Sequence, residues 1–256
     1  MIPKVIHYCW FGGNPMSSKI KEYIETWKKF CPDYKIMEWN ESNFNVNKNA
    51  YCKEAYEAKK WAFVTDYVRI YVLEKMGGIY LDTDVEICKN LDSLLTYNAF
   101  MGIETEDRIS TGVIGCAPGC DWMRSILKAY KGRHFLQENG KYDFMTNVEF
   151  ISKLTQDKYK VILDNNKVIF GDNYLILPFE YLCAKSWYTR EVCKTHNTYA
   201  IHHFDGSWLP AKDKRLSMLK ERYLARYSAY LPIYVAIKLS GMHARAVNHF
   251  LKKRKN

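Results

Sequence analysis

The sequence predicts an α/β fold in which helices pack against a largely parallel sheet. Short β-prone segments alternate with segments of helical apolar spacing, which is the pattern of α/β sandwiches. The length of 256 residues suits one core with a smaller extension. A hydrophobic content of 48% with 15% aromatic residues excludes a disordered chain.

The first part of the chain predicts a β-α-β unit. Residues 4–10 are β-prone and are followed by a loop rich in Gly, Asn and Pro. Ser17 or Ser18 caps a helix that runs to about Phe30, and residues 34–39 form the next strand. This order is typical of the first unit of an α/β sheet.

A long helical region at 51–76 follows, with two helices meeting near Trp61, and Gly77-Gly78 ends it. Further strands are expected at 79–81, 85–87, 100–103, 112–116, 161–163, 168–170, 175–177 and 199–203, and further helices at 122–131 and 147–155.

Two carboxylates follow the strand at 79–81. In an extended backbone Tyr80, Asp82 and Asp84 point to one face. Two such carboxylates repel each other unless a cation lies between them, and hard oxygen ligands favour Mg²⁺ or Mn²⁺. The alternative is a turn or a helix cap, for which Asp is also common. The position at a strand end favours the metal site.

Three other sets of residues are candidates for chemistry. Asp66 and Arg69 share a face of a mostly apolar helix, either as an ion pair or as functional groups. Trp10 at a strand end stacks on a nucleobase or belongs to the core. His202 and His203 end a late strand, and one of them is a candidate third metal ligand. Motifs of covalent hydrolases and of P-loop ATPases are absent.

The charge is unevenly distributed. The formal net charge of +10 lies wholly in residues 212–256, which hold twelve basic and two acidic residues. This basic, helix-prone tail binds an anionic membrane surface or nucleic acid, or packs on the preceding domain. We therefore expect a catalytic domain at 1–211 and a basic helical tail at 212–256.

The sequence gives expectations about the compartment as well. The first residues lack the pattern of a signal peptide, and no segment is apolar enough for a membrane span. Eight scattered cysteines suggest reduced thiols. We expect a cytoplasmic protein, located at the inner face of the plasma membrane if the tail binds there.

Residues 2–10, Ile-Pro-Lys-Val-Ile-His-Tyr-Cys-Trp, and the block at 62–85 resemble the sugar-binding Asp-X-Asp glycosyltransferases of family 32. That family includes mannosyl-, galactosyl- and capsular-polysaccharide transferases. The glucosylating domains of large clostridial toxins are more distantly similar. The resemblance covers residues 1–210 and is dense in the first 90. It implies a GT-A-type fold, a single Rossmann-like α/β/α sandwich with a mixed, mainly parallel sheet.

The resemblance also implies roles for single residues. His7 and Trp10 belong to the opening motif of the donor site, where Trp10 would stack on the nucleobase. Thr65 stands where Ser is common and keeps the hydroxyl. Asn147 would bind the donor sugar, and Trp208 would close over the diphosphate.

The remaining implied roles concern the sugar and the metal. Asp66 and Arg69 would hold hydroxyls of the donor sugar, and Tyr80 would contact the donor. The implied ligands of Mn²⁺ or Mg²⁺ are Asp82, Asp84 and His203. Asp84 would bind the ion directly, whereas Asp82 would bind the ion or a water on it and would also face the ribose.

The resulting functional prediction is a metal-dependent, retaining glycosyltransferase. It would move a hexose or N-acetylhexosamine from a nucleotide diphosphate sugar, preferably a UDP-sugar, to a saccharide acceptor, including a lipid-linked one. The expected role is cell-surface or capsular polysaccharide synthesis. A nucleotide-sugar hydrolase or phosphoesterase shares the Asp pair and is the alternative; a nucleic-acid-binding module is less supported, because residues 1–211 carry no net charge.

Overall fold

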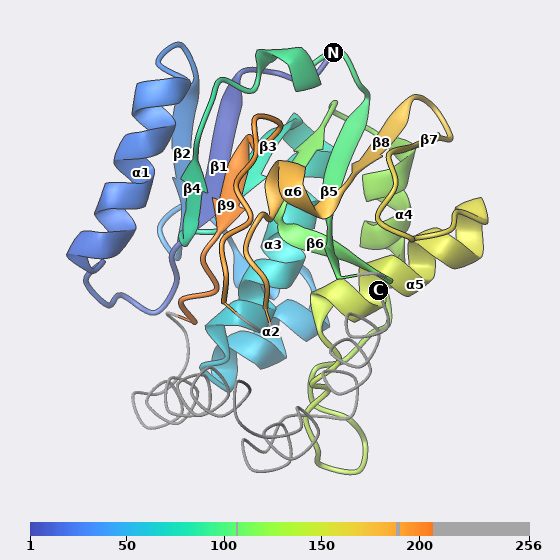
Figure 1. Cartoon of the computed structure of the whole chain (residues 1–256). Coiled ribbons are helices and arrows are strands. Elements are labelled where there is room, and N and C mark those ends of the chain that lie inside the picture. Colours follow the sequence, from blue (N-terminus) through green and yellow to red (C-terminus); the bar gives the residue numbers. More distant parts are fainter. Residues whose placement is uncertain (106, 188–189, 207–256) are drawn as a thin grey trace, which may run out of the picture. The chain divides into compact units, whose positions relative to one another are not determined.

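The computed structural model describes residues 1–105, 107–187 and 190–206 (Figure 1). The chain divides into two compact units. The first combines Met1–Ala184 with Cys193–His203, and the second combines Lys185–Val192 with the chain from Phe204. The features below belong to the first unit. The predicted boundary at 211, the tail at 212–256 and Trp208 lie outside the described residues.

A seven-stranded sheet with the order β2-β1-β3-β6-β5-β8-β7 forms the centre of the first unit. Its strands are β1 (Val5–Cys9), β2 (Lys35–Trp39), β3 (Gly78–Leu81), β5 (Ala99–Thr105), β6 (Arg108–Cys116), β7 (Val168–Phe170) and β8 (Tyr174–Leu177). Within this sheet β6 and β7 are antiparallel to their neighbours, and the other strands share one direction. The predicted mixed, mainly parallel α/β fold is confirmed.

Helices cover this sheet on both faces. They are α1 (Ser18–Phe30), α2 (Ala50–Glu57), α3 (Trp61–Met76), α4 (Asp121–Ala129), α5 (Asn147–Tyr159) and α6 (Phe179–Leu182), with 3₁₀ turns at Val46–Lys48 and Asp92–Leu94. One apolar core joins the sheet to α2, α3, α4 and α5, and the other joins it to α1 and α6. Within the described residues, no helix is both long and apolar enough to cross a membrane.

Local sequence signals account for most of these boundaries. The Ser17 hydroxyl accepts a hydrogen bond from the Ile20 amide and so caps α1 as expected. The helical region splits at Trp61 into α2 and α3, also as expected. After α3 the chain turns directly into β3 through Gly78, whose φ is +108°. A Cβ there would lie 2.7 Å from the Val5 carbonyl oxygen, so only glycine allows β3 to pack this closely on β1.

A second, two-stranded sheet pairs β4 (Val85–Ile87) with β9 (Ala200–His202) in antiparallel register. Val85 lies opposite His202, so residues far apart in sequence become neighbours. The Trp27 indole of α1 donates to the Val85 carbonyl oxygen at 2.7 Å and ties this small sheet to α1. Figure 1 shows the pair in front of the main sheet, between α1 and α6.

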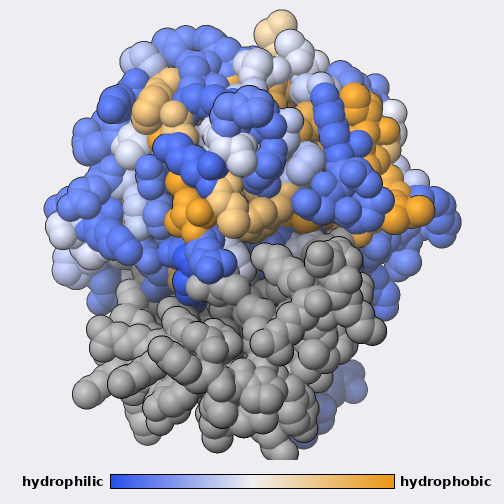
Figure 2. Space-filling view, viewed as in Figure 1, coloured by the Kyte–Doolittle hydropathy of each residue, from blue (hydrophilic) through white to orange (hydrophobic). Residues whose placement is uncertain are grey.

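Two sequence expectations differ from the structure. Residues 161–163 form no strand, and α5 extends to Tyr159 instead of ending at 155. Lys160 closes α5 in a left-handed conformation, and Ile162 is 73% exposed, so this apolar run has no neighbouring strand to pair with. The nearby edge strand β7 leaves Ile169 exposed, and Figure 2 shows hydrophobic residues gathered over the β8 and β7 edge.

His7 is fully buried on β1 and joins β1, β2 and the α3–β3 turn. The Trp39 indole N–H, which can only donate, lies 3.1 Å from His7 Nδ1. His7 Nε2 lies 2.9 Å from the Gly77 carbonyl oxygen, which can only accept. The neutral ring protonated on Nε2 satisfies both contacts. Burial lowers the pKa of His7, which also favours the neutral form.

Because the folded state disfavours protonated His7, we expect the free energy of unfolding to fall as the pH drops below about 6.5, the ordinary pKa of histidine. A His7→Gln variant should be less stable at neutral pH but should lose less stability on acidification. Urea unfolding midpoints measured across this pH range test it. His196→Gln, at an exposed histidine, is the control and should keep the steep pH dependence. An equally steep profile in His7→Gln would contradict the assignment.

Candidate active site

The carboxyl ends of β1 and β3 meet at one edge of the main sheet. The two strands are parallel, with His7 opposite Tyr80, so Trp10 and Asp82 follow neighbouring strands at the same edge. Trp10 is half-buried, and its indole N–H donates to the Asn14 carbonyl oxygen at 2.6 Å. This edge is where open α/β sheets bind ligands.

Asp82, Asp84 and His202 form a candidate metal centre, since one ligand atom of each lies within 4.8 Å of the others. His202 Nε2 lies 3.3 Å from an Asp84 oxygen and 3.9 Å from an Asp82 oxygen. An ion about 2.1 Å from each ligand atom holds adjacent ligands about 3 Å apart and opposite ones about 4 Å apart. The two histidine separations therefore fit one divalent ion, and two carboxylates with one imidazole are ligands that divalent cations accept.

The structure corrects which histidine faces the Asp pair. The sequence prediction named His203, but the register of β4 with β9 brings His202 beside Val85 and hence beside Asp84. Gly112 makes room for this ring, because a Cβ there would lie 2.8 Å from His202 Nδ1. Burial lowers the pKa of His202, but Asp84, Cys183 and Asp82 together outweigh burial and raise it well above its ordinary value.

His203 points to the other side of the strand. Its Nε2 lies 2.9 Å from a Glu86 oxygen, and its ring stacks on Tyr23 of α1 at 4.6 Å between centroids. Successive side chains of a strand point to opposite faces. A histidine that faces α1 therefore cannot also face the Asp pair.

The buried guanidinium of Arg69 connects two carboxylates. Arg69 lies 3.1 Å from an Asp66 oxygen and 3.1 Å from an Asp82 oxygen, and it donates to the Thr111 carbonyl oxygen of β6 at 2.8 Å. Burial lowers the pKa of Arg69, but Asp82, Tyr80 and Asp66 raise it by more, so the guanidinium stays charged. With its side chain 5% exposed, Arg69 orients Asp82 and is not open to a sugar hydroxyl.

Tyr80 and Thr65 support the same arrangement. The Tyr80 hydroxyl donates to Asp82 at 3.0 Å, and its ring lies 4.6 Å from the Arg69 guanidinium carbon. Tyr80 is 2% exposed. The Thr65 hydroxyl donates to the Ala62 carbonyl oxygen and accepts from Arg69. Like His7, Tyr80 is buried with its polar group engaged; the expected contacts of both with a donor stay predictions.

Asp66 and Asn147 lie close together. Burial raises the pKa of Asp66 to about 6, while Arg69 and the Asn147 amide act against burial. The Asn147 carbonyl oxygen accepts from the Tyr130 hydroxyl at 3.3 Å. Its buried Nδ2 has no hydrogen bond of ordinary geometry among the described residues. Asn147 and Asp66 are both buried, at 5% and 8% exposed, and form a polar pair beside Arg69.

Glu104 is a further carboxyl group of the site, and the sequence reasoning missed it. It is half-buried on β5, and burial raises its pKa to about 7; the charge of His202 acts against burial, and those of Asp82 and Asp84 add to it. No motif marks Glu104, because β5 reaches the site only through its antiparallel pairing with β6.

Replacing Arg69 with Met should destabilise the protein by about 3–5 kcal/mol, because Asp66 and Asp82 then lose the cation that compensates their burial. Lys28→Met is the control. It removes an exposed pair with Glu25 and should cost less than about 1 kcal/mol. Urea unfolding of both variants measures the difference. Equal losses would show that Arg69 is not needed to hold the carboxylates.

The choice of histidine is tested by metal binding. We expect Mn²⁺ to raise the unfolding temperature of the protein. In His202→Ala the half-maximal Mn²⁺ concentration should rise at least about tenfold, because losing a ligand costs no less than losing a residue that supports one. His203→Ala should bind Mn²⁺ as the unchanged protein does. The reverse ranking of the two variants would restore the original assignment of His203.

Residues 17–101 match the family model described as glycosyltransferase sugar-binding region containing DXD motif. Inositol phosphoceramide mannosyltransferase 3 of Schizosaccharomyces pombe is 31% identical over 138 residues, which are 50% of this chain and 36% of that protein. An uncharacterized glycosyltransferase of Acanthamoeba polyphaga mimivirus is 28% identical over 222 residues, 82% of this chain and 85% of that protein. The chain thus spans only about a third of the yeast relative.

Solved structures are similar at lower identity. PaToxG glycosyltransferase has a TM-score of 0.48 at 18% identity, with 61% of this chain and 70% of that chain covered. The galactosyltransferase LgtC in complex with donor and acceptor sugar analogs has a TM-score of 0.44 at 10% identity, with 79% and 88% covered. The sequence matches confirm the predicted resemblance: residues 17–101 carry the glycosyltransferase sugar-binding region, and Asp82-Thr83-Asp84 is an Asp-X-Asp sequence inside the matched range.

Proposed function

We propose that this protein transfers a hexose or N-acetylhexosamine from a nucleotide diphosphate sugar to a saccharide acceptor, with a divalent cation held by Asp82, Asp84 and His202. The observation that carries the proposal is the convergence of these three side chains at a strand edge, with Asp82 and Asp84 inside the matched sugar-binding region. Cell-surface or capsular polysaccharide synthesis is the proposed setting.

The cation, Mn²⁺ in preference to Mg²⁺, would neutralise the negative charge of the leaving nucleotide diphosphate when bound. Neighbouring residues orient the side chains that would bind this cation. Arg69 and Tyr80 both bind Asp82 and hold its carboxylate in one orientation. His202 lies against Asp84 from the opposite strand of the small sheet. Ligands fixed before binding lose little freedom when the donor arrives.

The donor sugar would lie towards Asp66, which is bound to Arg69, and towards Asn147 beside it. Trp10, at the end of β1, supplies a half-exposed ring for the nucleobase. Arg69 acts here through Asp66 and Asp82 and is a positioning residue.

Retention of the anomeric configuration by front-face attack remains part of the proposal. A carboxylate bound to a guanidinium is a weak nucleophile because its charge is already compensated, and Asp66 and Asp82 are both bound to Arg69. Burial raises the pKa of Glu104, the further carboxyl group of the site, and so disfavours its charged form. These groups favour a path without a covalent sugar intermediate.

A panel of UDP-galactose, UDP-N-acetylglucosamine, UDP-glucose and GDP-mannose tests the donor, with binding read as a thermal shift. A UDP-sugar is our preference; GDP-mannose is included because a yeast relative is named as a mannosyltransferase. We expect one donor to stabilise the protein only when Mn²⁺ is present. Asp84→Asn should lose this response, whereas Asp172→Asn, at an exposed position, should keep it. A full response in Asp84→Asn would refute the metal role.

To distinguish transfer from hydrolysis, the protein is incubated with the donor that binds, and the sugar-containing products are identified. Saccharide acceptors, free and lipid-linked, should divert the sugar from water into a larger saccharide, with the anomeric configuration of the donor. Release of free sugar that no acceptor reduces would instead favour a nucleotide-sugar hydrolase.

A further inference from the structure

Exposed apolar side chains concentrate in the segment between α4 and α5. The described residues include ten exposed large hydrophobic residues, and four of them lie within residues 136–145. These four are Leu136, Tyr142, Phe144 and Met145. Scattered exposed apolar residues need no explanation, but a group within ten positions indicates a contact surface.

This segment forms a hairpin that packs against the domain. Leu136 pairs with Tyr142 in an antiparallel bridge, and the Tyr142 ring stacks on buried Phe135 at 5.1 Å between centroids. Phe144 packs its ring edge against Phe63 of α3 at 5.8 Å. These contacts fix the positions of the exposed rings, so binding a partner costs little conformational entropy in this segment.

A groove of about 740 Å³ between α4 and α5 continues from the hairpin at Met145. Its apolar floor consists of Met145, Phe150 and Leu154, and its lysines are Lys128, Lys153 and Lys158. Asp157 is its one acidic lining residue.

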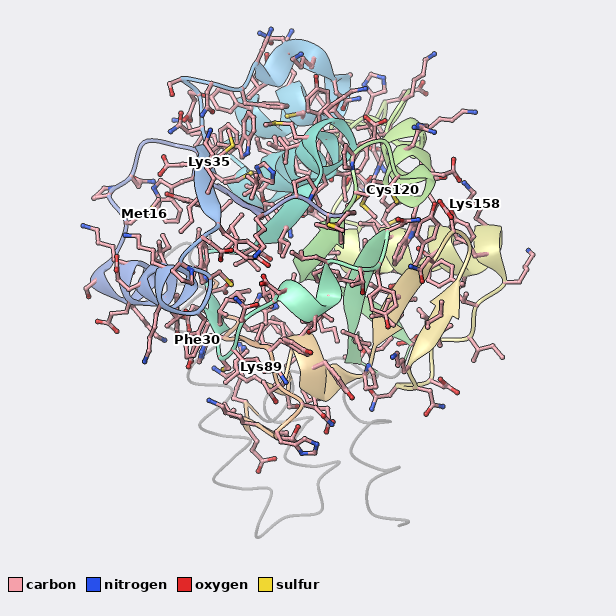
Figure 3. The ribbon with its side chains drawn as sticks, turned by 90° about the horizontal axis from the view of Figure 1, so that it is seen from above. Met16, Phe30, Lys35, Lys89, Cys120 and Lys158 are labelled. Atoms are coloured by element: carbon pink, nitrogen blue, oxygen red, sulfur yellow. The ribbon has the colours of Figure 1, made fainter. Side chains whose placement is uncertain are left out.

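The lysines of the groove differ in their pairing. Lys158, labelled in Figure 3, lines the groove and donates to Asp121 of α4 at 2.6 Å. Lys128 and Lys153 are exposed, and no carboxylate of the described residues pairs with either. The surface thus combines exposed rings, an apolar floor and two uncompensated positive charges.

We propose that this α4–α5 surface, formed by the hairpin at 136–145 with the groove residues Lys128, Lys153 and Leu154, docks on a bilayer that contains anionic phospholipid. Such a bilayer offers apolar lipid chains to the exposed rings and lipid phosphates to the lysines. A small soluble anion such as inorganic phosphate would use the lysines but would leave the exposed rings in water.

Docking on a bilayer would also favour a particular class of acceptor, an inference that rests on the proposed function. α5 begins at Asn147, two residues after Met145, and the Asn147 side chain turns inward beside Asp66. A bilayer on the α4–α5 surface would therefore lie next to the sugar side of the candidate site. The acceptor class that fits is a saccharide carried on a membrane lipid.

Sedimentation of the full chain with vesicles tests the docking, without any donor present. Binding should be strong to vesicles of phosphatidylcholine with phosphatidylglycerol and weak to phosphatidylcholine alone. The double variant Tyr142→Ser, Phe144→Ser should bind roughly tenfold more weakly because buried ring area is lost. Lys128→Gln with Lys153→Gln should cost about fivefold per lysine.

Matched controls change the same residue types elsewhere. Ile162→Ser with Ile169→Ser removes exposed apolar residues, and Lys21→Gln with Lys35→Gln removes exposed lysines. Both pairs should bind vesicles as the unchanged chain does. The Mn²⁺-dependent thermal shift with donor should persist in every variant, which separates a failure of docking from a failure of the proposed function.

Two results would overturn the proposal. Hairpin and lysine variants that bind anionic vesicles as the unchanged chain does would place membrane binding elsewhere in the protein. Variants that change only the self-association seen by analytical ultracentrifugation, with vesicle binding unaffected, would make this surface a contact between copies of the chain.

Discussion

The buried charge of Arg69 is the interaction on which the candidate site depends. Its guanidinium binds Asp66 within α3, Asp82 after β3 and the Thr111 carbonyl oxygen of β6. Buried ion pairs give little net stability, because desolvation offsets the attraction, but they tolerate few alternative arrangements. Three elements are thereby held in one geometry, and the orientation of the Asp82 carboxylate follows from it.

The second constraint is the pairing of β4 with β9. It places His202 opposite Val85, which directly follows the Asp pair. The cluster of Asp82, Asp84 and His202 therefore takes ligands from two segments more than a hundred residues apart in the sequence. On the other side, α5 begins at Asn147, which faces Asp66, and the outer side of the same helix lines the groove. The sugar side and the proposed docking surface share this helix.

Most elements were predictable because their signals are local. The Ser17 cap, the break at Trp61 and the Gly77-Gly78 stop depend only on neighbouring residues. The run at 161–163 failed for the opposite reason, because an apolar tripeptide becomes a strand only where another strand is free to pair with it. The reversed direction of β6 likewise depends on its neighbours in the sheet.

The sequence by itself determined the α/β class and the shared helical face of Asp66 and Arg69, since both follow from backbone periodicity. It also placed the Asp82–Asp84 pair after β3, although the chain there forms a turn and not the extended strand assumed for the pair. Only the tertiary structure decided that His202 faces the Asp pair, that His7, Arg69 and Tyr80 are buried supports, and that Glu104 joins the site. The physical reason is that strand register and burial arise from pairing between distant segments, which local spacing does not encode.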